Sequence, residues 1–191
     1  MFEEIILRME HLLIEQMEGI YLSDLLIIVL VCALFIFVPG YVLNKKKVVS
    51  FKRVIHFYLT IVYVAVLLLF TVFRRDFGSR SGYIYSGITV GVSRRGRIYS
   101  INQMIYCFYN VLLFVPWGFL LSFFRNKEPM IKTVIMTMLL GFLSSFSIEI
   151  VQHITRTGFF EVTDLVMNTA GSALGAFIGY LFFTVLRKEK A

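Results

Sequence analysis

Two long apolar stretches of this chain carry polar residues at the ends where they face each other. Glu149 and Gln152 lie near the end of the first stretch, and Asp164 and Asn168 lie at the start of the second, beyond a short hinge. Carboxylates and amides at the edge of a bilayer are costly to bury and commonly mark functional sites. Two such carboxylates could serve as general acid and general base, or they could bind a polar ligand. These residues are therefore the core of a candidate site.

The apolar stretches themselves are long enough to cross a membrane. Hydrophobic residues make up 58% of the 191-residue chain, and the mean hydropathy is +0.79, whereas soluble domains contain about 45–50% apolar residues. A span needs about 20 residues and must be helical, because lipid satisfies no backbone hydrogen bonds. We expect spans at residues 25–43, 54–73, 105–124, 133–151 and 165–186. The predicted fold is all-α, a polytopic membrane helix bundle of about five transmembrane helices, forming one domain over residues 1–191.

Two further segments lie outside the spans. Residues 1–23 place apolar side chains on one helical face and several glutamates on the other, which predicts an amphipathic helix at the membrane interface or packed on the bundle formed by residues 24–191. The loop at residues 74–104 alternates glycine and serine with β-forming residues. It is consistent with a small β-hairpin, with an ordered cap over the bundle, or with a flexible loop.

Lysine and arginine are slightly more numerous in the loops on the side of the C-terminus. The positive-inside rule then predicts a multi-pass protein of the cell membrane with its N-terminus outside and its C-terminus in the cytoplasm. In that arrangement residues 74–104 form an outer loop, and Asn110 lies at the same depth as the candidate site. Arg74, Arg75 and Arg156 lie on the same side and are candidate partners for the carboxylates, since an unpaired buried charge is strongly disfavoured.

Small residues accompany both halves of the site. Gly141 and Ser145 precede Glu149 at helical spacing, and Gly171, Gly175 and Gly179 follow Asn168. Small faces allow membrane helices to approach closely, so we expect the fourth and fifth spans to pack as a hairpin through them. The alternative to a functional site is a polar clasp that only closes the bundle.

Other classes of function find little support. The net charge of +7 is gathered beside the spans, which favours membrane anchoring, and we expect no nucleic-acid partner. His153 follows Glu149 at one helical turn, but a second histidine is missing nearby, so we expect no metal. The chain contains no recognisable cofactor motif, and its two cysteines have no metal-binding spacing. We therefore expect no cofactor.

Two blocks of sequence resemble the VanZ-like family of bacterial membrane proteins. Residues 110–121 (NVLLFVPWGFLL) are similar to the family pattern N-x-L-L-F-x-P-x-G-F. Glu149-x-x-Gln152 and residues 160–171 (FEVTDLVMNTAG) are similar to E-x-x-Q followed by F-D-x-D-D-[LI]-[LI]-x-N-T-x-G. Glu161 and Thr163 stand where the family has aspartates, and Gly158 stands where a hinge arginine is usual.

The resemblance implies a cytoplasmic-membrane protein of a family linked to reduced susceptibility to lipoglycopeptide antibiotics such as teicoplanin, and it implies no known reaction. The leading hypothesis is an outward-facing polar pocket that binds or modifies a cell-envelope component. Its partners would be membrane lipid, a lipid-linked envelope precursor or a glycopeptide antibiotic. The alternative is a membrane-embedded enzyme that acts on an envelope lipid headgroup, with Glu149 and Asp164 as the catalytic acid and base. A transporter is less favoured, because the chain has no inverted repeat.

Overall fold

The structure is a computed structural model, and it describes residues 2–92, 96, 98–125 and 127–188. Its elements, in chain order, are α1 (Phe2–Met17), α2 (Leu22–Lys45), α3 (Phe51–Leu68), the π-helix η1 (Leu69–Phe73), β1 (Ile84–Tyr85), α4 (Ile101–Ser122), the 3₁₀ turn η2 (Phe123–Arg125), α5 (Met130–Thr155), β2 (Phe160–Glu161) and α6 (Val162–Lys188).

The five predicted spans are confirmed. Helices long and apolar enough to cross a membrane cover Leu22–Lys45, Phe51–Phe73, Ile101–Arg125, Met130–Thr155 and Val162–Leu186. All five begin three or four residues earlier than the apolar stretches, because polar residues contribute to the first turn. In α4, for example, the hydroxyl of Ser100 caps the helix by accepting a hydrogen bond from the Gln103 N–H at 3.2 Å.

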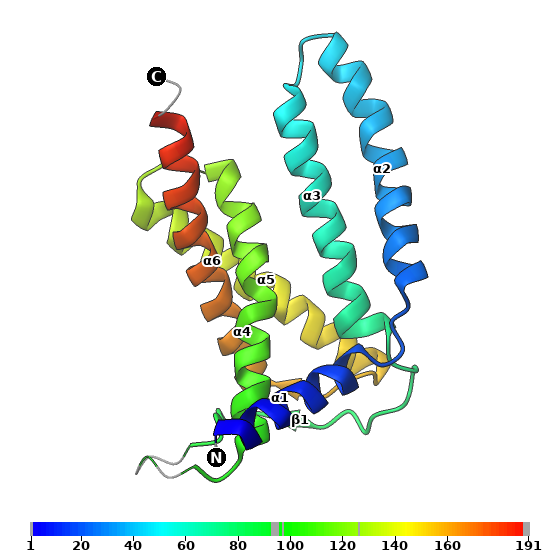
Figure 1. The fold of residues 1–191 in the computed structure, drawn as a ribbon, viewed down its shortest axis with the longest axis vertical. Coiled ribbons are helices and arrows are strands. Elements are labelled where there is room, and N and C mark those ends of the chain that lie inside the picture. The colour runs from blue at the N-terminus through cyan, green and yellow to red at the C-terminus, as the bar shows by residue number, and fades with distance from the viewer. Residues whose placement is uncertain (1, 93–95, 97, 126, 189–191) are drawn as a thin grey trace.

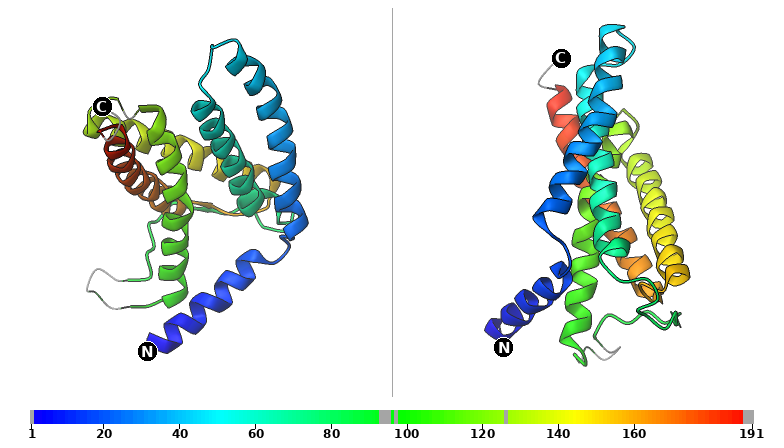
Figure 2. Two further views of the ribbon diagram at one scale, coloured as in Figure 1. Left: turned by 45° about the horizontal axis from the view of Figure 1, so that its top comes forward. Right: turned by 90° about the vertical axis from the view of Figure 1, so that its right-hand side faces the viewer.

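The helices are arranged as a compact group and a hairpin. Helix α6 packs against both α4 and α5, whereas α2 packs on α3, which in turn contacts α4 (Figure 1). Helix α1 lies across one end of the bundle, close to the start of α4 and far from the end of α6 (Figure 2). We call the end that carries α1, the end of α3 and the α5–α6 hinge the site face, and the other end the opposite face.

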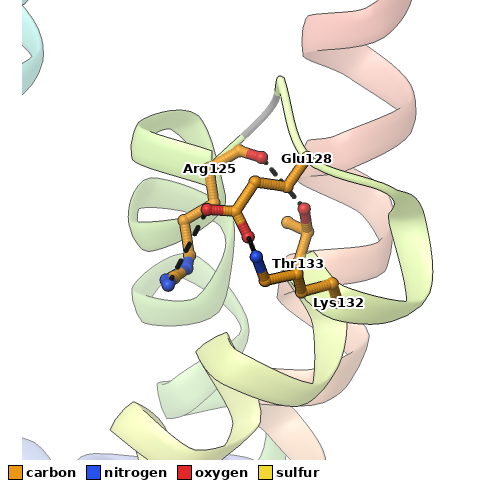
Figure 3. Close-up of polar contacts among 4 residues, drawn as sticks. All are labelled: Arg125, Glu128, Lys132 and Thr133. Atoms are coloured by element: carbon orange, nitrogen blue, oxygen red, sulfur yellow. Dashed lines mark hydrogen bonds and ion pairs between the residues drawn. The ribbon is translucent and has the colours of Figure 1, made fainter.

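The opposite face holds the turn between α4 and α5, which a small polar network closes (Figure 3). The carboxylate of Glu128 lies 3.8 Å from Arg125 Nη2 and 3.5 Å from Lys132 Nζ. The Thr133 hydroxyl donates to the Arg125 carbonyl at 3.0 Å. These contacts join the end of η2 to the first turn of α5. They lie at the end of the bundle that is remote from the candidate site.

The glycines of α6 pack against a helix other than the expected one. A Cβ at Gly171 or Gly175 would collide with the backbone of α4, at the carbonyls of Val111 and Val115. The α5–α6 hairpin does form, but it packs through Gly141 of α5 against the Ser172 side chain. The glycine face of α6 therefore brings its backbone against α4, and its serine–asparagine face meets α5.

The described part of the loop after α3 is an ordered cap over the α5–α6 hinge. Strand β1 pairs in parallel with β2, and the N–H groups of Gly78 and Arg80 donate to the carbonyls of Thr155 and Arg156 at 3.0 and 2.9 Å. A single antiparallel bridge joins Val92 to Ile98. The chain thus combines two of the expected alternatives: the cap covers the hinge, and a short antiparallel pairing follows it.

Candidate functional site

Glu149 lies at the centre of the site face, on α5. Its side chain is 2% exposed, and its Oε2 accepts a hydrogen bond from the backbone N–H of Glu161 at 2.8 Å. Glu161 belongs to β2, so this bond fastens the strand that follows the hinge onto the helix that precedes it. The carboxylate thereby gains one charge-assisted hydrogen bond from the backbone.

Helix α5 ends abruptly at Thr155, and the hinge that follows turns the chain so that β2 lies back over α5. Arg156 adopts a left-handed conformation with φ of 53°, and the N–H groups of Thr157 and Gly158 both donate to the Gln152 carbonyl, at 3.0 and 3.4 Å. Gly158 leaves room for its neighbours, because a Cβ there would lie 3.1 Å from Gln152 Cδ and 3.3 Å from Arg75 Nη1. The hinge therefore seats the Gln152 amide and the Arg75 guanidinium side by side.

Asp164 joins Glu149 from the other side of the hinge. It lies in the first turn of α6, where the partial positive charge of the helix end favours a carboxylate. Its carboxylate lies beside the Asn110 side chain of α4 and within electrostatic range of Glu161 and of Glu149. Three carboxylates from α5, β2 and α6 thus gather beside one α4 amide.

Arg75 is the cation that faces these acids. Its Nη1 donates to the Thr157 carbonyl at 3.0 Å, and its charge interacts with Asp164, Glu149 and Glu161. Burial lowers its pKa, and the nearby Arg80 lowers that pKa further. Arg80 itself lies over the Phe159 ring at 5.7 Å. Within the described residues neither arginine has a carboxylate within 4.0 Å, in contrast to Arg8 and Arg125, which do.

Burial also affects the third carboxylate. The side chain of Glu161 is half-buried in the short strand β2. This burial raises its pKa, and the Arg75 charge opposes the shift. Glu161 and Arg75 are therefore linked electrostatically, although they do not form a close ion pair.

Arg74 points away from the acids and binds α1. Its guanidinium donates to the carbonyls of Glu15 and Gln16 at 3.1 and 2.6 Å, and also to the Gln16 side chain. These groups lie at the C-terminal end of α1, and the last turn of that helix contains no basic residue. Burial, followed by the repulsion of Arg75, lowers the pKa of Arg74 to about 10, so it stays charged at neutral pH.

Gln152 and Asn168 fasten the site to the bundle. Gln152 Nε2 donates to the Thr71 carbonyl at 2.7 Å, and Thr71 lies in the π-helix η1, a distortion that is frequent at functional sites. Asn168 lies one turn deeper than Asp164, and its Nδ2 donates to the Ser145 hydroxyl at 2.8 Å. Both amides therefore hold helices together rather than facing the gathered acids.

The predicted residues thus separate into groups. Glu149, Asp164, Asn110 and Arg75 come together, with Gln152 at their edge. Asn168 lies deeper, Arg74 serves α1, and Arg156 is exposed at the hinge.

Sequence reasoning gave no individual role to Glu161, the third acid, or to Arg80, the second cation. It also missed Thr163, whose hydroxyl accepts from the Thr89 N–H at 3.0 Å and so fastens the cap to α6. A signal for Glu161 was present, since it is an acid only three residues before Asp164. Thr163 was marked only as a departure from the family pattern, which has an aspartate at that position, and no signal singled out Arg80.

Comparison with known protein families gives a match that covers nearly the whole membrane bundle. The family model described as VanZ/LLP1 matches residues 24–184, from the start of α2 to near the end of α6. No curated protein and no solved structure matches the chain significantly.

Proposed function

This chain belongs to the VanZ/LLP1 family, and we propose that the site face of its membrane bundle binds the headgroup of a cell-envelope lipid. The observation that carries the proposal is the pair Arg75 and Arg80. Both lie at the hinge, where the charge of Arg80 lowers the pKa of Arg75, and no described carboxylate lies within 4.0 Å of either guanidinium. Guanidinium groups gathered in this way are suited to a phosphate, which they can bind through charge-assisted hydrogen bonds.

The neighbouring acids suit the rest of such a headgroup. Glu149, Glu161 and Asp164 are hydrogen-bond acceptors when ionised, so they favour hydroxyl or ammonium groups attached to the phosphate. The ligand class is thus a phosphate carrying a sugar, glycerol or amine. Lipid-linked envelope precursors have this chemistry, and phosphatidylglycerol is its simplest membrane representative.

The orientation of the bundle belongs to the same proposal. The site face is the outer face, because the loops of the opposite face are slightly richer in lysine and arginine and α1 is acidic. A cysteine placed at Lys46 should react with a membrane-impermeant maleimide only after the cells are permeabilised. Labelling in intact cells would reverse the topology and direct the site towards the cytoplasm.

Lipid binding can be tested directly on the purified protein. Native mass spectrometry should show more phosphatidylglycerol than phosphatidylcholine retained, because choline has no donor for the carboxylates. Arg75→Gln should remove this preference, whereas Arg53→Gln, an exposed arginine at the opposite face, should keep it. Equal retention of both lipids by the wild type would refute the proposal.

The link to antibiotics rests on the family. We expect that expressing this chain in a susceptible Gram-positive host raises the minimal inhibitory concentration of teicoplanin, and that Arg75→Gln and Glu149→Gln abolish the increase. This result would follow if the site bound the glycopeptide antibiotic itself. It would also follow if the site bound a lipid precursor and so kept that precursor from the antibiotic. An increase that survives both substitutions would separate resistance from the site.

A catalytic role is the second candidate. It is favoured by the proximity of the Glu149 and Asp164 carboxylates, since one acid and one base side by side can move a proton during headgroup transfer or hydrolysis. Incubating the protein with a radiolabelled lipid-linked peptidoglycan precursor separates the alternatives. A released headgroup that disappears in both Glu149→Gln and Asp164→Asn would indicate an enzyme, whereas an unchanged lipid would indicate a binder.

A further inference from the structure

We propose that a groove between α3, α4 and α5 holds one hydrocarbon chain of the lipid whose headgroup binds at Arg75. This inference rests on the proposed function. The groove is a cavity of about 270 Å³ lined by Leu67 and Leu68 of α3, Trp117 of α4, and Ser144, Ser147 and Val151 of α5. Its lining comes from membrane-spanning segments, so its surroundings are hydrocarbon.

The position of the groove connects it to the headgroup site. Helix α5 meets the α3 segment at η1, where Gln152 is bonded to the Thr71 carbonyl. Gln152 follows Val151 of the groove directly, and its side chain shares the space over Gly158 with Arg75. A lipid with its phosphate at Arg75 would therefore have the groove immediately beneath it.

The depth of the groove is also suitable. Ser147 lies eight residues before the end of α5 at Thr155, which corresponds to about 12 Å along a helix. The hydrocarbon core of a bilayer is about 30 Å thick, so the groove belongs to the leaflet on the site face. A chain that starts at a headgroup on that face reaches it without crossing the bilayer.

The lining favours hydrocarbon over a polar occupant. The hydroxyls of Ser144 and Ser147 both donate to their own helix, to the carbonyls of Leu140 and Leu143 at 2.8 Å. The Trp117 indole N–H donates to the Ser144 hydroxyl at 3.2 Å. The polar hydrogens of the groove are thus already used, and the small serines leave a hollow where a leucine would fill the space.

Trp117 supplies the measurement, because it is the single tryptophan of the chain and it lines the groove. The protein is placed in phosphatidylcholine nanodiscs that contain a small proportion of phosphatidylglycerol with brominated chains, which quench tryptophan fluorescence on contact. Brominated phosphatidylcholine at the same proportion reports random contact with surrounding lipid. We expect brominated phosphatidylglycerol to reach half-maximal quenching at a clearly lower proportion than brominated phosphatidylcholine does.

Variants establish that the chain lies in the groove. Ser147→Phe fills the hollow and should raise the proportion needed for half-maximal quenching about tenfold, because the chain loses the contacts of several methylene groups. Leu143→Phe, at an exposed position of the same helix, should leave it unchanged. Equal quenching by the two brominated lipids, or a dimer that shields Trp117 from both, would overturn the inference.

A water-soluble short-chain phosphatidylglycerol keeps this inference distinct from the proposed function. If that molecule binds in an Arg75-dependent way and the brominated long chains still quench equally, the headgroup site stands and the groove assignment is wrong. If the short-chain lipid fails to bind and the quenching is equal, both are wrong.

Discussion

Arg74 and Arg75, which follow η1, should have separable roles, although they are neighbours in the sequence. Arg74 binds the end of α1, and Arg75 faces the carboxylates. Arg74→Gln should therefore release α1 and leave lipid binding largely intact. Arg75→Gln should abolish the lipid preference and leave α1 in place.

The magnitude for α1 follows from its contacts. Arg74 donates three hydrogen bonds to Glu15 and Gln16, and hydrogen bonds contribute about 0.5–1.5 kcal/mol each. Because these groups are partly exposed, we take the lower half of that range, which gives about 2 kcal/mol. The contact between the Tyr109 hydroxyl and the Met9 carbonyl, at 2.6 Å, remains. A loss of about 2 kcal/mol corresponds to about a 30-fold larger open population of α1.

Hydrogen–deuterium exchange measures this population. In Arg74→Gln, the amides of α1 should exchange about 30-fold faster than in the wild type wherever exchange is limited by the opening equilibrium. In Arg75→Gln they should be unchanged. Faster exchange of α1 in Arg75→Gln, with no change in Arg74→Gln, would refute this division of roles between the two arginines.

Two further outcomes follow from the packing and from Glu161. Gly175→Ala should destabilise the purified protein by about 1–3 kcal/mol, because its Cβ would collide with the α4 backbone, whereas Gly87→Ala, which has nothing within 4 Å, should leave the melting temperature unchanged; equal effects would contradict the α4–α6 contact. Burial raises the pKa of folded Glu161 above its unfolded value, so the folded state binds this proton more tightly and stability should fall as pH rises from the unfolded pKa through the folded one. Glu161→Gln should flatten that part of the pH–stability curve. If thermal melts between pH 4 and 8 gave the same slope for the variant and the wild type, the pH dependence would come from other groups.

Hydropathy was sufficient to predict the five spans, because a bilayer demands about 20 apolar residues from each helix and leaves few alternatives. It could not decide which helix the α6 glycines would face. Gly171, Gly175 and Gly179 mark a face capable of close approach, but α4 and α5 both offer small residues to meet it. That choice depends on how three helices fit together, which a one-dimensional pattern does not record.

The sequence predicted the positions of the acidic residues of the candidate site better than those of its arginines. Glu149 and Asp164 come together because the hinge is short and both lie at helix ends. The separation of Arg74 from Arg75 depends on where α1 docks, and Arg80 reaches the hinge only because the cap folds back over it. These positions are set by long-range contacts rather than by local spacing.

Binding of an envelope-lipid phosphate by Arg75 is tested most directly by a cryo-electron microscopy structure of the protein in a lipid nanodisc that contains phosphatidylglycerol. We expect phosphate density within about 3 Å of the Arg75 guanidinium, with the attached glycerol directed towards Glu149 or Asp164. An Arg75 guanidinium closed onto those carboxylates, with the phosphate elsewhere, would show that the site face is a polar clasp that binds no headgroup.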